Sequence, residues 1–188
     1  VSNVSYSKDG KRIYFNVCVN TDPTKTLCDI YVMIKKGSSY TQAIRLDKLN
    51  MKGYTSLHPS VANVDSLREV IFFVSDRPGG EGKLDIWFSK YTNNEYSDPQ
   101  NIGSPINSYD DDVTPYYCEQ NKTLYFASSG HYGLGNYDIF ASVWNGVKWS
   151  EPVNLGTPLN TSYDDFYPYI KIKKDKIRGY ITSNRTGT

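Results

Sequence analysis

The chain has 188 residues, 38% of them hydrophobic, and its 21 lysines and arginines almost balance its 20 aspartates and glutamates. No basic cluster is flanked by aromatic side chains as a phosphate-binding groove requires, which argues against nucleic acid as a partner. A mean hydropathy of −0.56, with no apolar run of about eighteen residues, indicates a soluble domain that does not itself enter a membrane. No signal peptide begins at Val1, so we expect any export signal to be encoded upstream.

The first unit of the chain covers about residues 1–52 and contains short hydrophobic segments separated by turn-forming residues. Cys18 and Cys28 stand on either side of the loop Asn20–Lys25 in this unit. They either form a disulfide across the mouth of the hairpin, which would indicate an oxidising compartment, or remain unpaired as small hydrophobic side chains. The sequence leaves both alternatives open.

Segments of the second unit, about residues 53–108, are repeated in the third unit, about residues 109–161. The heptapeptide Asn-Ile-Gly-Ser-Pro-Ile-Asn at 101–107 returns as Asn-Leu-Gly-Thr-Pro-Leu-Asn at 154–160, an offset of 53 residues. Other landmarks recur in the same order: Asp85-Ile86-Trp87 as Asp138-Ile139-Phe140, Phe72-Phe73 as Tyr125-Phe126, and, in the first unit, Tyr14-Phe15 and Asp29-Ile30-Tyr31. Self-similarity at a fixed period of this size is typical of repeat arrays and propellers.

Each unit reads as four short strands, because aromatic and β-branched residues dominate its hydrophobic segments and no helical period persists. A four-stranded antiparallel sheet has two apolar faces, which successive units can bury by packing face to face. We therefore predict an all-β fold, a β-propeller of four-stranded antiparallel blades; a β-sandwich would explain the turns but not the period. The fourth unit, residues 162–188, holds only two strands, so we expect about three and a half blades belonging to a larger propeller.

The segment Pro115-Tyr-Tyr-Cys-Glu-Gln-Asn-Lys-Thr-Leu-Tyr-Phe126 and its counterpart at residues 4–15 resemble the TolB-like, WD-type β-propeller repeat, whose pattern is Pro-x-aromatic-Ser-x-Asp-Gly-Lys-x-Leu-Tyr-Phe. The segments 75–80 (Ser-Asp-Arg-Pro-Gly-Gly) and 149–156 (Trp-Ser-Glu-Pro-Val-Asn-Leu-Gly) resemble the subgroup found in envelope proteins of Bacteroidetes-type bacteria. The chain departs from the pattern at Val4, where the family has proline. The resemblance implies a periplasmic or outer-membrane-associated location beside OmpA-like peptidoglycan-binding domains, as in PorE-like components of type IX secretion.

Propeller topology brings two kinds of loop to one face: those joining the second and third strands of a blade, and those joining one blade to the next. Irregular loops on a rigid scaffold are where recognition residues concentrate. We therefore predict that this face binds a protein partner of the cell envelope. The candidate binding residues are Arg77, Asp110, Asp111, Asp112, His131, Tyr132, Asp164 and Asp165.

The acidic runs 110–112 and 164–165 have two interpretations. Consecutive carboxylates can present oxygen ligands to a hard cation such as Ca²⁺. We favour a structural role, because each run follows a polar turn and lies just before a proline of the next strand, so that its side chains can bond turn amides. We therefore predict no metal site, and we interpret Asp29, Asp85 and Asp138 as caps of the hairpin loops before them.

No catalytic motif is present: there is no HExxH, no Cys/His cluster with zinc spacing and no Gly-x-Ser-x-Gly elbow, and neither His58 nor His131 has a local partner. We predict that the chain is not an enzyme, takes no cofactor and serves as a protein-binding or scaffolding module of the bacterial cell envelope. Its assembly would be of the type IX secretion or peptidoglycan-linked kind. The alternative is a propeller attached to a hydrolase, either a serine peptidase or a glycan-active enzyme.

Overall fold

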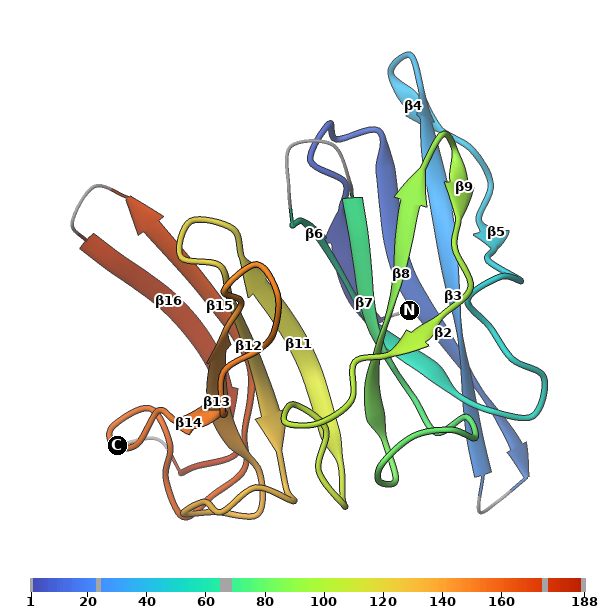
Figure 1. The fold of residues 1–188 in the computed structure, drawn as a ribbon. Coiled ribbons are helices and arrows are strands. Elements are labelled where there is room, and N and C mark those ends of the chain that lie inside the picture. The colour runs from blue at the N-terminus through green and yellow to red at the C-terminus, as the bar shows by residue number, and fades with distance from the viewer. Residues whose placement is uncertain (1, 23–24, 65–68, 174–175, 187–188) are drawn as a thin grey trace.

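The computed structural model describes residues 2–22, 25–64, 69–173 and 176–186, and these contain strands and turns but no helix. The strands form four antiparallel sheets, which follow one another along the chain and stand side by side (Figure 1). We call these sheets blades 1 to 4. Within these ranges no helix is long and apolar enough to cross a membrane.

Blade 1 comprises β1 (Ser2–Tyr6), β2 (Arg12–Asp22), β3 (Lys25–Lys36), β4 (Ser39–Tyr40) and β5 (Ile44–Arg45). Blade 2 comprises β6 (Ser56–Asn63), β7 (Glu69–Ser75), β8 (Asp85–Thr92), β9 (Glu95–Tyr96) and β10 (Gln100–Asn101). Blade 3 comprises β11 (Asp112–Cys118), β12 (Thr123–Ser128), β13 (Asp138–Val143) and β14 (Val153–Asn154), and blade 4 comprises β15 (Asp165–Lys173) and β16 (Lys176–Ser183). The prediction of an all-β propeller with four-stranded antiparallel blades is confirmed; the short β4 and β9 only extend the hairpin after the third strand.

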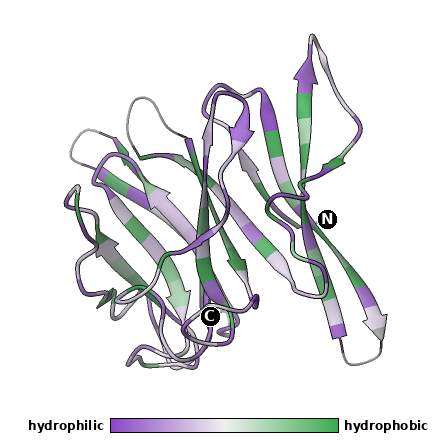
Figure 2. Ribbon diagram, turned by 45° about the vertical axis from the view of Figure 1, so that its right-hand side comes forward, coloured by the Kyte–Doolittle hydropathy of each residue, from purple (hydrophilic) through white to green (hydrophobic). Residues whose placement is uncertain are grey.

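The sequence of β7 shows why the blades pack face to face. Every residue of this strand is buried, because the apolar run 70–74 lies between two neighbouring sheets. Side chains alternate along a strand, so Ile71 and Phe73 face blade 1, whereas Phe72 and Val74 face blade 3. Figure 2 shows hydrophobic bands along the strands of the blades. Each interface between blades is therefore a separate layer of the core.

The first strand of each blade lies innermost. The strand β6 contacts both β1 and β11, and β11 also contacts β15. The four inner strands thus surround a common axis, and β6, β11 and β15 each begin where the chain arrives from the preceding blade.

A buried asparagine explains the repeated heptapeptide. In blade 2, Ile86 N donates to Asn107 Oδ1 at 2.9 Å, and Asn107 Nδ2 donates to Ile86 O at 3.0 Å. The side chain thereby fixes the connection after β10 to the third strand. The same pair of bonds, each 2.8 Å long, joins Asn50 to Ile30 and Asn160 to Ile139.

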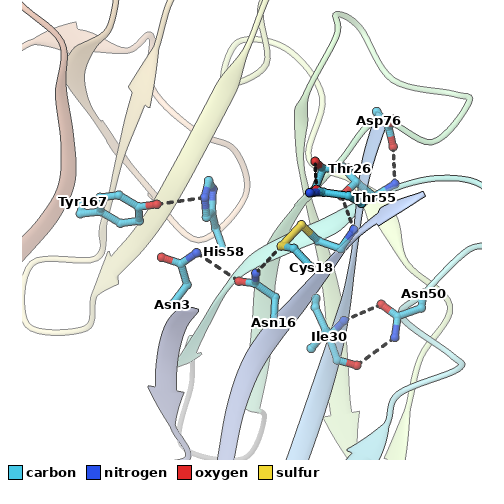
Figure 3. The surroundings of a disulfide bond; sticks show 12 residues. Asn3, Asn16, Cys18, Thr26, Ile30, Asn50, Thr55, His58, Asp76 and Tyr167 are labelled. Carbon is cyan, nitrogen blue, oxygen red and sulfur yellow. Dashed lines mark hydrogen bonds between the residues drawn. A yellow bond between two sulfur atoms is a disulfide. The ribbon is translucent and has the colours of Figure 1, made fainter. Parts of the chain in front are cut away.

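The two cysteines of blade 1 form a disulfide. Cys18 on β2 lies opposite Cys28 on β3, and their sulfur atoms are 2.01 Å apart. Cys28 N also donates to Thr55 Oγ1 at 2.9 Å, which ties the hairpin to the start of blade 2 (Figure 3). The remaining cysteine, Cys118, is free and buried.

Candidate functional site

The connections between blades and the loops after the second strands meet at one face, at the lower edge of Figure 1, which we call the loop face. Backbone hydrogen bonds join the two kinds of segment: Lys83 N donates to Asp110 O at 3.3 Å, and Ser129 N donates to Asp111 O at 3.0 Å. The tip of the Asn20–Lys25 loop, residues 23–24, lies outside the described residues. Elsewhere, the loops of this face brace one another across the blade boundaries.

Three side chains on the loop face reach back to the preceding blade. They are Arg77, His131 and Arg185, each following the second strand of its blade. His131 Nε2 bonds to Ile106 O at 2.8 Å, Arg185 Nη2 donates to Leu159 O at 2.7 Å, and Arg77 Nη2 donates to Leu49 O. These three carbonyls are equivalent, because each precedes one of the buried asparagines. Arg77 and His131, predicted on the binding face, therefore each bond a carbonyl at the boundary with the preceding blade, and their part in partner binding stays a prediction.

Asp112 and Asp165 occupy equivalent and fully buried positions at the starts of β11 and β15. Ser108 donates to Asp112 Oδ2 from its backbone N at 2.5 Å and from its Oγ at 2.8 Å. Thr161 donates to Asp165 Oδ2 in the same way, at 2.8 and 2.9 Å. Both carboxyls bond turn amides, as the structural interpretation of the acidic runs requires.

The two buried carboxyls differ in the cation beside them. Arg185 Nη2 lies 2.6 Å from Asp165 Oδ1, whereas His131 Nε2 lies 3.9 Å from Asp112 Oδ1. Burial raises the pKa of Asp112 to about 6, although hydrogen bonds from serines oppose the rise. Burial also acts on Asp165, but hydrogen bonds from neighbouring hydroxyls and Arg185 hold its pKa below the ordinary value.

The other acidic candidates each have a separate partner. Lys83 Nζ lies 2.9 Å from Asp110 Oδ1, Tyr137 donates its hydroxyl to Asp111 at 2.5 Å, and Asn184 Nδ2 donates to Asp164 at 2.9 Å. Across the part of the chain that the structure describes, no group of three or more His, Cys, Asp or Glu side chains could hold a metal ion. The lack of a metal site stays a prediction.

The aspartates before the third strands behave in two ways. Asp85 Oδ2 accepts from Glu81 N at 2.8 Å, and Asp138 Oδ2 accepts from Gly135 N at 3.2 Å, so both cap the preceding loops as predicted. The prediction was wrong for Asp29, whose carboxylate pairs with Arg45 at 2.9 Å. The reason is that β2 and β3 remain paired beyond Asp29, so no loop amide lies beside it.

Exposed hydrophobic side chains gather on the loop face of blades 3 and 4. Tyr132 is 97% exposed and Tyr109 is 76% exposed, and Leu134 and Tyr163 are also exposed. Tyr132 and Leu134 belong to the β12–β13 loop, whereas Tyr109 and Tyr163 belong to the connections that enter blades 3 and 4. We call these four residues the aromatic ridge.

Two glycines wedge the β12–β13 loop between those connections. A Cβ on Gly130 would lie 2.1 Å from Ser108 Oγ, and a Cβ on Gly135 would lie 2.2 Å from Tyr163 O. Only glycine allows such a close approach of loop to connection. The ridge is therefore carried by segments packed directly against one another.

A cavity of about 480 Å³ lies on the axis, between the inner strands of the four blades. Each inner strand has a register shift, at which one residue takes a positive φ and lines this cavity. The four residues are Asn3 (55°), His58 (52°), Thr114 (52°) and Tyr167 (51°). Such backbone strain away from glycine is uncommon and concentrates at functional sites. We call these residues the axial quartet.

Hydrogen bonds join His58, Thr114 and Tyr167 of the axial quartet. Thr114 N donates to His58 Nδ1 at 3.3 Å, so the neutral imidazole carries its proton on Nε2 and donates it to the Tyr167 hydroxyl at 3.2 Å (Figure 3). Burial lowers the pKa of His58 to about 4, which keeps the ring neutral at pH 7. Desolvation raises the pKa of Tyr167, so its phenol stays protonated. The Tyr167 proton is thus available to a ligand in the cavity.

The axial quartet was not predicted from the sequence, because its members lie more than fifty residues apart and belong to four different units. One signal was present. In the last three units the position before a strand proline holds histidine, threonine and tyrosine in turn, where the surrounding residues repeat. An asymmetric site requires different side chains at equivalent positions, and a varied residue within a repeated segment is the sequence signal of that difference.

No family model matches the sequence, and no curated protein matches it. Solved structures share the fold over nearly the whole chain. With 96% of the chain covered, it superposes on a protein of unknown function from Dyadobacter fermentans (TM-score 0.60, 15% identity) and on TolB from Acinetobacter baumannii (TM-score 0.53, 15% identity). An alpha-L-arabinofuranosidase from Lactobacillus brevis matches over 98% of the chain with a TM-score of 0.64 and 13% identity.

The chain spans 48% of the Dyadobacter protein, 40% of TolB and 66% of the arabinofuranosidase. At these identities the likeness concerns the fold alone, and it confirms the propeller that the TolB-like repeat implied.

The prediction that the chain is not an enzyme is corrected by the third comparison, because a glycoside hydrolase has this same fold. The prediction failed because it rested on the lack of local motifs. The axial quartet brings side chains of four blades together around one cavity, and no local motif records such an arrangement.

Proposed function

We propose that this chain is a protein-binding module of the bacterial cell envelope, and that the aromatic ridge is its partner surface. The observation that carries the proposal is the nearly complete exposure of Tyr132 beside Tyr109, Leu134 and Tyr163 on mutually braced loops. Tyrosines supply large contact areas at a low cost in conformational entropy, and they are enriched among the residues that dominate binding energy.

Polar groups next to the aromatic ridge brace the segments that carry it. His131 bonds to Ile106 O at the boundary with blade 2, and Asp112 holds the turn at Ser108 that enters blade 3, so the segments beneath the ridge are braced. The ridge side chains project from these segments into solvent. A partner that buries them loses little loop entropy on binding.

Three observations favour the cell envelope. The Cys18–Cys28 disulfide belongs to an oxidising compartment such as the periplasm. The repeat resembles those of Bacteroidetes-type envelope propellers, and TolB shares the fold. The resemblance points to a partner within an outer-membrane assembly, of the type IX secretion or peptidoglycan-linked kind.

The test replaces single tyrosines and measures partner recovery from envelope extracts. We expect Tyr132→Ala and Tyr109→Ala each to lower recovery at least tenfold, because a central aromatic anchor contributes about 2 kcal/mol or more. The matched control is Tyr180→Ala, which removes an equally exposed (76%) tyrosine from β16, away from the ridge. Equal recovery from all three variants would remove the ridge as the partner surface.

A second candidate, a glycan-active hydrolase propeller, is favoured by one specific observation. The lining of the axial cavity includes the four different polar side chains of the axial quartet, among them Tyr167 with a hydroxyl proton to donate, which suits the hydroxyl groups of a sugar. Its described lining residues include no carboxylate, so these residues alone would position a sugar and not cleave it. This candidate predicts that p-nitrophenyl α-L-arabinofuranoside binds in the cavity with a Kd that rises in Tyr167→Phe. The lack of saturable binding to the native chain would count against it.

A further inference from the structure

A groove of about 380 Å³ opens between blades 2 and 3, at the ends of the strands remote from the loop face. It lies where the apolar core between these blades reaches the surface. Its apolar walls are formed by Val70, Phe72, Phe88, Ile102, Trp144 and Trp149. Lys90 and Lys122 also line it, and none of its described lining residues carries a carboxylate.

The neighbouring interface, between blades 1 and 2, has an equivalent place. Tyr91 and Tyr96 pair across the hairpin that leaves β8, with ring centres 4.7 Å apart. Trp144 and Trp149 pair in the same way after β13, with ring centres 5.1 Å apart. The two aromatic pairs are therefore repeat equivalents, and their surroundings can be compared directly.

Beside Tyr91 and Tyr96 the space is filled by an ion pair. Arg12 Nη2 lies 3.0 Å from Glu69 Oε2, and the Arg12 guanidinium sits 4.3 Å from the centre of the Tyr91 ring. Tyr14 completes the network by donating to Glu69 at 3.3 Å. A carboxylate thus lies next to the aromatic pair, and its charge is balanced.

Beside Trp144 and Trp149, residues of different chemistry occupy the equivalent positions of that network. Glu69 lies opposite Tyr91 in the sheet, and Trp144 N donates to the backbone carbonyl Lys122 O at 2.8 Å, so Lys122 takes the position of Glu69. By the same strand register, Val70 occupies in blade 2 the position that Arg12 occupies in blade 1, and Phe72 occupies the position of Tyr14. Neither Lys90 nor Lys122 forms an ion pair with a described residue. Among its described lining residues the groove consequently has aromatic walls and two lysines, but no carboxylate.

We propose that this groove binds a small amphiphile with one carboxylate, of the medium-chain fatty acid type. The carboxylate is balanced by Lys122 and Lys90, supplying the negative charge that Glu69 supplies in the neighbouring interface. The apolar chain lies along Phe72 and Phe88, under the tryptophan pair. A volume of about 380 Å³ is within the range of pockets for small molecules, which are lined mainly by apolar side chains with a few polar groups that fix orientation.

Tryptophan fluorescence tests the proposal on the intact chain. Two of its three tryptophans line the groove, whereas Trp87 is buried in the core between blades 1 and 2. We expect decanoate to change the emission saturably and to bind at least fivefold more tightly than decanol, with decylammonium weaker still. Equal affinity for decanoate and decylammonium, or no saturable change with decanoate, would overturn the proposal.

Variants distinguish recognition of the carboxylate by the lysines from nonspecific hydrophobic binding. Lys122→Gln should weaken decanoate binding at least fivefold and leave decanol binding unchanged, whereas Lys148→Gln, an exposed lysine outside the groove, should change neither. The pair Val70→Arg with Lys122→Glu rebuilds the ion pair of the neighbouring interface and should abolish decanoate binding. If that double variant does not fold, Lys90→Gln with Lys122→Gln replaces it. Unchanged decanoate affinity in Lys122→Gln would refute the assigned role of the lysines.

Discussion

Replacing Asn107 by leucine is expected to lower the free energy of unfolding by about 4 kcal/mol, although the two side chains are similar in size. The substitution removes the bonds to Ile86 N and Ile86 O, and it leaves both of these buried backbone groups without a partner. Each unsatisfied buried group costs about 1–3 kcal/mol, and the bond to Asn101 at 2.9 Å is lost as well. Urea unfolding measures the effect, which corresponds to a fall in Tm of roughly 8–16 °C.

The control for this experiment is Asn136→Leu, at an exposed asparagine on the β12–β13 loop. Surface substitutions of this kind change stability by about 0.5 kcal/mol or less. Asn160→Leu should match Asn107→Leu, because Asn160 makes the same two bonds in blade 3. If Asn107→Leu were no more destabilising than the control, the repeated heptapeptide would need another explanation.

The fold was predictable from the sequence because the features that define a blade recur within each unit. The aromatic dipeptide lies on a single strand, and the aspartate that opens the third strand of blade 2 and the asparagine of the heptapeptide form their bonds within one unit. Their spacing is local, so the period reveals them. Hydrophobic alternation then requires that both faces of β7 be covered, which leads to stacked blades.

The candidate sites were harder to predict, because they depend on contacts between units. Arg77 and His131 were expected to face a partner, since charge on a loop usually faces water. Their actual targets, Leu49 O and Ile106 O, are backbone atoms of the preceding blade, which a sequence does not display. The axial quartet is hidden for the same reason.

Equivalent positions of successive blades, compared with one another, distinguish residues of the scaffold from residues of the candidate sites. Positions that hold the same residue in successive units carry the scaffold, as the buried asparagines do. Positions that change chemistry while the frame stays fixed mark the places where one interface differs from the next. Lys122 in place of Glu69 and Tyr167 in place of His58 are two such changes. A third is His131, which takes in blade 3 the position that arginine holds in blades 2 and 4.

That third change leads to an expected dependence of stability on pH. Burial raises the folded-state pKa of Asp112 to about 6, above its ordinary value of 3.8. The folded state therefore holds this proton more firmly than the unfolded chain does. The stabilisation is complete below about pH 4 and is lost as the pH rises through 6. The shift of roughly two units corresponds to about 3 kcal/mol at most.

Two variants test this dependence by difference from the native chain. Asp112→Asn keeps an acceptor for Ser108 N but cannot ionise, so it should match the native chain near pH 4 and exceed its unfolding free energy by about 2–3 kcal/mol at pH 7.5. His131→Arg should also be more stable at pH 7.5, because an arginine at the equivalent position lies 2.6 Å from Asp165 in blade 4, where the carboxyl pKa is held low. Urea titrations between pH 4 and 8 give both curves. A stability difference for Asp112→Asn that stays flat across this range, or that favours the native chain at pH 7.5, would show that Asp112 is ionised in the folded state at no cost.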